Sequence, residues 1–356
     1  MNKIAALLTL ALVAAPIGRN TFGQGVPPAP GATFMNPLKS GGPDPWVISR
    51  DGYFYYMNTT GSNLTIWKTK QITDLAHAEK KVVWVPPATG MYSKELWAPE
   101  LHFLMGKWYL YFSADDGRNE NHRIYVLENA SPDPLQGEWA FKGKLADPTD
   151  KWAIDGTVFE ESGKLFAVWS GEERTGVQAI YMARLKNPWT ITGNHIRLSL
   201  PEYPWEKVGD LDPKNKIVGI PHVDVNEGPE ILQHGDKIFL VYSASGCWTN
   251  YYALGMLTAS KSADLMLPAS WKKSSAPVFR QKPSASAFGT GHNTFFKSPD
   301  GTQDWILYHA NPKADQGCGN LRSPRAQPFT WKTDGTPDFG EPLPIDQPIP
   351  VPSGQK

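Results

Sequence analysis

The chain has 356 residues, of which 40% are hydrophobic and 20% charged, so it can bury a sizeable core and global disorder is disfavoured. Its 35 basic residues balance its 35 acidic ones. This balance argues against nucleic acid, an anionic membrane or a polyanion as the main partner.

Residues 1–24 have the pattern of a secretory signal peptide. Lys3 supplies the positive end, residues 4–15 are apolar, and Pro16 interrupts the apolar run. This run is too short to span a bilayer, and no later stretch is long and apolar enough to do so. We therefore expect a secreted or periplasmic protein without a membrane span. Residues 25–42, rich in Pro and Gly, are interpreted as a lead-in arm.

From residue 44 onward one pattern occurs five times. It consists of a titratable residue, a short apolar strand, a turn containing Gly, and a second strand of β-branched and aromatic residues. The five titratable residues are Asp44, Glu100, Asp155, Glu227 and His292. A further segment with alternating apolar residues follows each pair of strands, so each repeat supplies about four short strands. No stretch has the period of an amphipathic helix.

Five four-stranded repeats predict an all-β fold, a five-bladed β-propeller with four-stranded antiparallel blades over residues 43–350. A single blade cannot bury both of its faces, so the blades should close into a ring. Because the first strand of each blade lies nearest the axis, the five titratable residues should meet at a central funnel. A β-sandwich with irregular repeats is the alternative, and it explains the fivefold pattern less well.

Carboxylates gathered in one funnel suit glycoside hydrolysis. One carboxylic acid protonates the leaving oxygen, and a carboxylate roughly 6.5–9.5 Å away activates water on the opposite face of the sugar. An apolar surround and nearby like charges raise the pKa of the proton donor. An isolated Asp or Glu more often braces a loop, but the fivefold repeat favours a functional role.

The five motifs together resemble glycoside hydrolase family 43, from about residue 36 to residue 344. They are Asp44-Pro, Trp97-Ala-Pro-Glu100, Ile154-Asp155-Gly, Glu227-Gly-Pro and Gly291-His292-Asn. The family includes α-L-arabinofuranosidases, endo-arabinanases and β-xylosidases, and the resemblance implies a five-bladed propeller with inverting chemistry. It implies that Asp44 is the general base and Glu227 the general acid. Asp155 would then modulate the pKa of the acid and orient it.

The resemblance also implies that His292 lies on the axis and helps hold a water-coordinated Ca²⁺ or a similar ion such as Na⁺. A lone His does not define a metal site, so a neutral core histidine is the alternative. The chemistry itself requires no cofactor. Arg325 resembles the substrate-binding arginine of the family, and Glu100 is expected to have a structural or rim role.

Further candidate sugar contacts are Trp97, Trp169 and Gln178, because flat aromatic faces pack under the C–H surfaces of sugars. Core packing is the alternative for both Trp residues. His222 either reaches the substrate or caps a loop. Cys247 and Cys318 either form a disulfide or remain two free buried thiols. An exported protein can contain either arrangement, so the sequence does not decide between them.

The amino-acid sequence around these motifs is most similar to the exo-acting α-L-arabinofuranosidase branch of the family. The expected function is the release of terminal L-arabinofuranosyl units from arabinan or arabinoxylan side chains. The expected partners are plant cell-wall polysaccharides or arabino-oligosaccharides, and we expect a monomer. A β-xylosidase or an endo-arabinanase on the same scaffold is the first alternative. A non-catalytic sugar-binding propeller is the second.

Overall fold

A computed structural model describes residues 31–211 and 220–355 of the chain. The predicted signal peptide at 1–24 and the first part of the lead-in arm lie outside these residues. From Thr33 onward the described chain is built almost entirely from strands, with a few short 3-10 turns. None of the described helical segments is long and apolar enough to cross a membrane.

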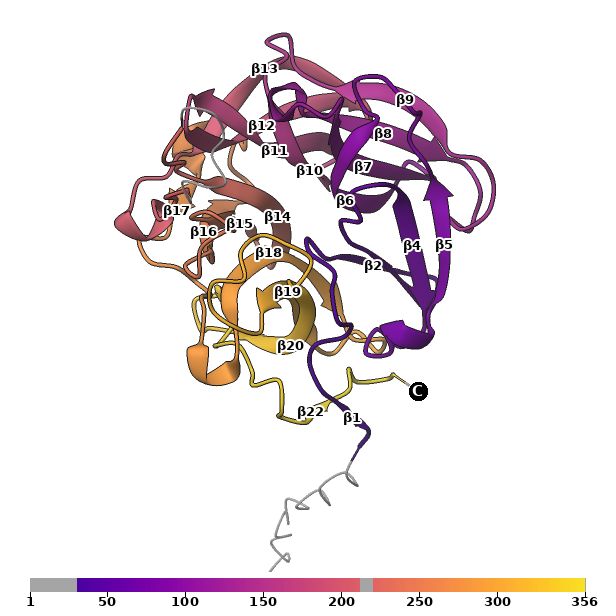
Figure 1. Cartoon of the computed structure of the whole chain (residues 1–356), viewed down its shortest axis with the longest axis vertical. Helices are drawn as coiled ribbons and strands as arrows, with labels where there is room; N and C mark the ends of the chain where they lie inside the picture. The colour runs from indigo at the N-terminus through magenta and orange to yellow at the C-terminus, as the bar shows by residue number, and fades with distance from the viewer. Residues whose placement is uncertain (1–30, 212–219, 356) are drawn as a thin grey trace, which may run out of the picture. The chain divides into compact units, whose positions relative to one another are not determined.

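Five four-stranded antiparallel sheets follow one another in chain order around a central axis (Figure 1), which confirms the predicted five-bladed propeller. Blade one comprises β2 (Trp46–Arg50), β3 (Tyr53–Met57), β4 (Leu64–Thr69) and β5 (Glu79–Trp84). Blade two comprises β6 (Lys94–Leu104), β7 (Lys107–Asp115), β8 (Arg123–Asn129) and β9 (Ala140–Leu145). Blade three comprises β10 (Ala153–Glu161), β11 (Lys164–Arg174), β12 (Val177–Asn187) and β13 (Thr190–Ser199). Blade four comprises β14 (Asn226–His234), β15 (Lys237–Ala244), β16 (Ala253–Ser260) and β17 (Lys272–Lys273). Blade five comprises β18 (Phe288–Lys297), β19 (Asp304–Asn311), β20 (Ser323–Trp331) and β21 (Pro337–Asp338). The 3-10 turns in the connections are η1 (Leu75–His77), η2 (Asn119–Asn121), η3 (Pro204–Glu206), η4 (Pro268–Ser270) and η5 (Pro283–Ala285).

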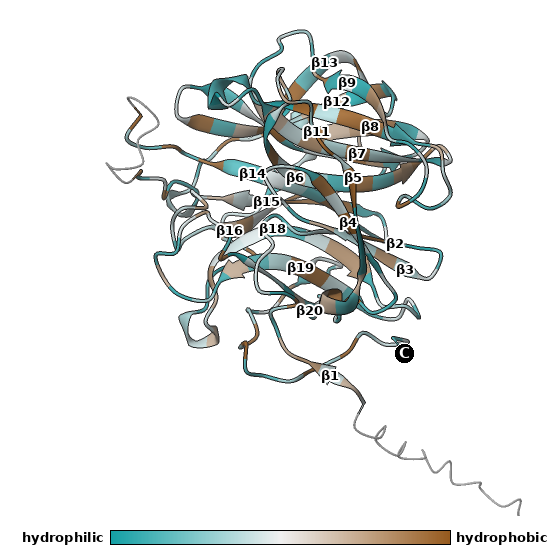
Figure 2. Ribbon diagram, turned by 45° about the vertical axis from the view of Figure 1, so that its right-hand side comes forward, coloured by the Kyte–Doolittle hydropathy of each residue, from teal (hydrophilic) through white to brown (hydrophobic). Residues whose placement is uncertain are grey.

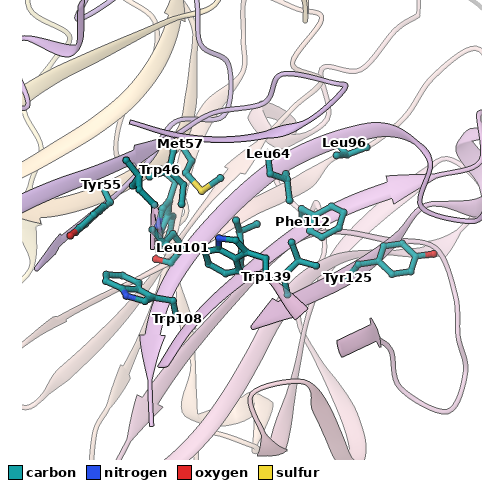
Figure 3. Close-up of a cluster of buried hydrophobic side chains, with 14 of the residues drawn as sticks. Trp46, Tyr55, Met57, Leu64, Leu96, Leu101, Trp108, Phe112, Tyr125 and Trp139 are labelled. Atoms are coloured by element: carbon teal, nitrogen blue, oxygen red, sulfur yellow. Dashed lines mark hydrogen bonds between the residues drawn. The ribbon is translucent and has the colours of Figure 1, made fainter. Parts of the chain in front are cut away.

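The hydrophobic core lies between neighbouring blades. Side chains alternate between the two faces of a strand, and hydrophobic and hydrophilic positions alternate along many strands in Figure 2. Between blades one and two, Trp46 packs with Leu101 and Trp108 (Figure 3). Between blades five and one, Val47 packs with Leu307. Each such buried side chain contributes about 1.5–3 kcal/mol relative to exposure, so both faces of a blade are stabilised only inside the ring.

The ends of the propeller are joined by short contacts. β1 (Thr33–Phe34) pairs with β22 (Ile349–Pro350) in an antiparallel two-stranded sheet. The Asn36 side chain exchanges two hydrogen bonds with the backbone of Ala326 in blade five, at 3.0 and 2.9 Å. The last part of the predicted lead-in arm is therefore bound to blade five.

The first strand of each blade has a residue with positive φ within it or, in blade one, two residues before it. These residues are Asp44 (56°), Ala98 (42°), Asp155 (55°), Gly228 (53°) and His292 (48°). Outside glycine this conformation costs on the order of 1–3 kcal/mol, so the surrounding contacts must hold it. The residue with positive φ in blade two is Ala98, not Glu100, and in blade four it is Gly228, one residue after Glu227.

A ring of hydrogen bonds holds these bends in place. In each case the backbone N–H of the bent residue donates to a side chain of the preceding blade. The pairs are Ala98 to Thr59 Oγ1 (2.7 Å), Asp155 to Ser113 Oγ (3.0 Å), Gly228 to Asp155 Oδ2 (3.0 Å), His292 to Ser243 Oγ (2.8 Å) and Asp44 to His309 Nδ1 (3.1 Å). The last pair closes the ring between blades five and one. Every step around the axis therefore carries one such bond, which fixes the directions of the axial side chains.

Candidate active site

A cavity of about 530 Å³ is lined by residues from all five blades. Four of the five residues predicted to meet at the axis line it, namely Asp44, Asp155, Glu227 and His292. Trp97 and Gln178 line it as well. Its volume lies within the range of about 300–1,000 Å³ that is usual for small-molecule sites. The fold therefore brings side chains that are far apart in sequence into one site.

Asp44 is held as a carboxylate. Its Oδ1 accepts a hydrogen bond from Arg322 Nη1 at 2.8 Å, and its Oδ2 accepts one from Thr59 Oγ1 at 2.7 Å. Burial alone would raise the pKa of Asp44, but the charge of Arg322 and the other polar neighbours together hold this pKa well below its usual range. The His309 ring accepts the backbone N–H of Asp44 at Nδ1, and burial lowers the pKa of His309, so this ring is neutral.

Glu227 has the opposite protonation behaviour. Its side chain is buried, and its Oε1 accepts a hydrogen bond from the Tyr252 hydroxyl at 2.9 Å. Burial raises the pKa of Glu227 to about 7; the Tyr252 hydrogen bond opposes this rise, and the charge of Asp44 adds to it. Glu227 can therefore hold a proton near neutral pH, as a general acid must.

Gly228 allows Glu227 to lie in the cavity wall. At its φ of +53° a side chain would be strained, and a Cβ atom there would lie 3.1 Å from Nδ1 of the His292 ring. The strand register shifts between Glu227 and Glu230, so the chain bulges at this point. Glycine is therefore required at position 228 both by its positive φ and by the short distance to the His292 ring.

Asp155 links the two sides of the site. Its Oδ2 accepts the backbone N–H of Gly228, the residue next to Glu227. Burial, followed by the charges of Glu227 and Asp44, raises the pKa of Asp155 well above its usual range. The contact through Gly228 is suited to orienting Glu227.

His292 lies beside Asp44, with its Nδ1 3.4 Å from Asp44 Oδ1, and burial lowers the pKa of the imidazole. Within residues 31–211 and 220–355, no group of three or more His, Cys, Asp or Glu side chains is placed to hold a metal ion. Among the described residues, an ion beside His292 would therefore have fewer than three such side chains as ligands, and water would complete its coordination. The predicted axial cation remains a prediction.

Two of the five candidate sugar contacts line the cavity. The Trp97 indole stacks on His122 with ring centroids 4.0 Å apart, and its Nε1 donates to Glu95 Oε2. Gln178 is the second residue of β12, and its backbone N–H donates to the carbonyl of Asp224.

The other three candidates do not line the cavity. Trp169 packs in the core between blades two and three and lines a separate pocket of about 40 Å³. His222 lies between two carboxylates, Asp210 at 2.6 Å and Asp224 at 2.9 Å, so it braces a loop. Arg325 is completely buried, and its guanidinium donates to the Ser286 carbonyl at 2.7 Å.

Arg322 takes the place in the cavity that was predicted for Arg325. The two residues are three positions apart, Arg322 directly before β20 and Arg325 within it, and side chains along an extended chain alternate between opposite faces. Arg322 therefore points to the cavity, whereas Arg325 points into the blade. Glu100 is also away from the cavity lining: it is buried in β6, where it contacts His102 Nε2 at 2.9 Å. This placement agrees with its expected structural role.

Several lining residues were not identified from the sequence. Trp248 lies in the loop between β15 and β16, and Trp152 precedes β10. Tyr252, in the same loop as Trp248, lies behind the lining and reaches the site through its hydrogen bond to Glu227. None of the three belongs to the repeated motif. Cys247 and Cys318 form a disulfide, the first of the two sequence alternatives, and both line the cavity. The Asn-Tyr-Tyr-Ala run before β16 resembles any strand entry, so no local signal marked Tyr252.

Comparison with known proteins agrees with this geometry. Residues 34–337 match the profile of glycosyl hydrolases family 43. An extracellular exo-α-(1→5)-L-arabinofuranosidase of Streptomyces avermitilis is 38% identical over 327 residues, covering 89% of this chain and 65% of the relative. A protein of the same description from Streptomyces chartreusis is 37% identical over 288 residues, covering 78% of this chain and 83% of the relative. The crystal structure of an α-L-arabinofuranosidase from Lactobacillus brevis has a TM-score of 0.80 and 37% identity, over 88% of this chain and 98% of that one.

The chain spans just under two thirds of the length of the Streptomyces avermitilis relative. The family match covers most of the chain and all five blades, and it includes the residues that line the cavity from Asp44 to Arg322. The chain belongs to glycosyl hydrolase family 43.

Proposed function

We propose that this protein is an inverting, exo-acting α-L-arabinofuranosidase that releases terminal L-arabinofuranosyl units from arabinan or arabinoxylan side chains. The observation that carries the proposal is the pair of opposite protonation states in one cavity. Asp44 is held ionised beside Arg322, and the pKa of Glu227 is raised to about 7. A protein that only binds sugars has no need of such a pair.

The chemistry follows from these two states. Glu227 donates its proton to the glycosidic oxygen as the bond from that oxygen to the anomeric carbon breaks. Asp44 accepts a proton from a water molecule, whose oxygen bonds to the anomeric carbon from the opposite face. Both changes in one step invert the anomeric centre. Asp155 acts through Gly228 to keep Glu227 in position.

Arg322 has two opposite effects on the action of Asp44 as a base. Its contact with Asp44 keeps the carboxylate ionised at low pH, but it also makes Asp44 a weaker base. Thr59 binds the other carboxylate oxygen. The two partners together fix the plane of the carboxylate and so the direction from which water is activated.

The substrate and location are inferred from two further points. A cavity of about 530 Å³ lined by all five blades suits one terminal sugar better than a long internal segment of polysaccharide. Two of the relatives are described as extracellular exo-α-(1→5)-L-arabinofuranosidases. We therefore place the protein outside the cytoplasm, acting on plant cell-wall polysaccharide or arabino-oligosaccharides.

The proposal is tested with two variants and two kinds of substrate. Glu227→Ala should abolish cleavage of arabinan but retain much activity on an aryl α-L-arabinofuranoside, whose leaving group needs no proton. Asp44→Ala should lose activity on both substrates. Glu230→Gln is a matched control, because Glu230 is a buried acid of the same strand that does not line the cavity. Its activity on both substrates should remain close to that of the wild type.

The stereochemistry and the sugar are tested separately. Proton NMR of the first product should show the β-anomer of L-arabinofuranose if the enzyme inverts. A panel of 4-nitrophenyl α-L-arabinofuranoside, β-D-xyloside and β-D-galactoside identifies the sugar. Preference for the xyloside would favour a β-xylosidase. Wild-type rates for both the Glu227→Ala and Asp44→Ala variants would refute the assignment of the acid and the base.

A further inference from the structure

The loop that joins β15 to β16 in blade four carries an aromatic side chain into the cavity wall. Trp248 lines the cavity beside the disulfide between Cys247 and Cys318. Its ring is partly exposed, whereas Trp108 and Trp305 in the blades are fully buried. It lies outside the five repeated motifs, and the reaction described above does not use it.

The indole is held rigidly by its surroundings. Its Nε1 donates a hydrogen bond to the Asp210 carbonyl at 2.9 Å. One part of the ring lies directly over Gly246, where an added Cβ atom would come within 2.3 Å of Cε2. Only glycine therefore permits this ring position. An aromatic side chain fixed in this way can bind a flat partner with little loss of conformational entropy.

The loop itself is fastened to blade five at two points. Cys247 is joined to Cys318 by the disulfide. The Asn250 side chain also exchanges two hydrogen bonds with Asp315, both 2.8 Å long. The position of the indole is thus determined by its hydrogen bond to Asp210 and by the contacts of its loop with blade five.

The same loop also holds the proposed general acid. It ends at Tyr252, whose hydroxyl donates to Glu227 Oε1 at 2.9 Å. Because Glu227 protonates the glycosidic oxygen, the sugar that leaves with this oxygen must depart on the Glu227 side. Trp248 is in the blade that supplies Glu227, whereas Asp44, the proposed base, belongs to blade one.

We propose that Trp248 is the stacking platform for the leaving-group sugar and so sets the preference for glycosyl over simple leaving groups. The inference rests on the proposed function, since it takes Glu227 as the acid. The adjoining wall from Cys247 and Cys318 is uncharged, which suits the C–H face of a neutral pentose. If the stacking contact is about as strong as one between two aromatic rings, the loss of the ring should weaken recognition of the leaving sugar by up to about tenfold.

The test compares two substrates that share the sugar to be cleaved. The leaving group of α-1,5-L-arabinobiose is a sugar. The leaving group of α-L-arabinofuranosyl fluoride is fluoride, which does not stack on Trp248. Trp248→Ala should lower the ratio of kcat/KM for the disaccharide to kcat/KM for the fluoride by up to about tenfold. The change should come mainly from KM for the disaccharide. Trp248→Phe, which keeps an aromatic face, should restore most of the ratio.

Tyr251→Ala is the matched control. Tyr251 is an aromatic residue of the same loop, 58% exposed, and is not among the residues that line the cavity. This variant should keep the wild-type ratio, and the melting temperature of each variant shows whether the loop remains intact. An unchanged ratio in Trp248→Ala, or an equal change in Tyr251→Ala, would overturn the inference. A wild-type enzyme inactive on both arabinofuranosyl substrates would instead overturn the proposed function, and this inference with it.

Discussion

Replacement of Tyr252 by Phe should shift the alkaline limb of activity to higher pH. The Tyr252 hydroxyl donates to Glu227 and so stabilises the ionised carboxylate, which lowers the pKa of Glu227 against the effect of burial. Without this hydrogen bond the protonated acid persists to higher pH. Since the reaction needs Glu227 protonated, kcat/KM in the wild type should fall as the pH rises through about 7.

The size of the shift follows from the strength of the bond. A hydrogen bond to a charged group contributes about 1.5–3 kcal/mol, and one pKa unit corresponds to about 1.36 kcal/mol. The limb should therefore move up by about one to two pH units. Tyr252 is only 1% exposed, so water does not readily replace the lost hydroxyl. Its ring stacks on His309 with centroids 5.7 Å apart, and Phe retains this contact.

The assay is kcat/KM for an arabino-oligosaccharide from pH 4 to about 10. An aryl arabinofuranoside whose leaving group needs no proton should show a much weaker alkaline limb in both enzymes. Tyr308→Phe is the control, because it removes another buried hydroxyl, which contacts Gln327 and does not line the cavity. An alkaline limb that stays in place, or moves to lower pH, in Tyr252→Phe would refute the reasoning.

Two further predictions concern the wall of the cavity. Arg322→Ala should raise the pKa of Asp44 and move the acidic limb of kcat/KM upward, because the guanidinium that favours the ionised form is gone; Arg322→Lys should move it less, and equal limbs in all three enzymes would contradict this electrostatic role. Replacing Cys247 and Cys318 together by Ser should lower the free energy of unfolding by about 4 kcal/mol, since the disulfide closes a loop with a sequence separation of 71. Urea unfolding with and without a reductant measures this loss, and a reductant that leaves the wild-type midpoint unchanged would show that the disulfide does not contribute.

The architecture could be predicted from the sequence because the information is local and repeated. Each blade carries its own alternating strands and Gly turns, and five copies leave few arrangements that bury both faces of each sheet. The meeting of Asp44, Asp155, Glu227 and His292 followed from the same repetition. The first strand of every blade faces the axis, so these residues needed no information from distant parts of the chain.

The residues that complete the site could not be predicted in this way. Arg322 and Arg325 differ only in the face of the chain on which they lie, and that is decided by where β20 begins. Tyr252 and Trp248 lie in a connection whose path depends on the disulfide and on contacts with other blades. Their neighbours are distant in sequence, so a local motif carries no record of them.

The amino-acid sequence by itself determined the blades, the ring and the set of carboxylates at the axis, because period-two strands and turn residues act over a few positions. Only the tertiary structure decided which carboxylate keeps its proton. That outcome depends on burial and on single contacts across the ring, from Arg322 to Asp44 and from Tyr252 to Glu227. Electrostatic interactions in a low-dielectric cavity vary steeply with distance, and those distances exist only after the blades have closed.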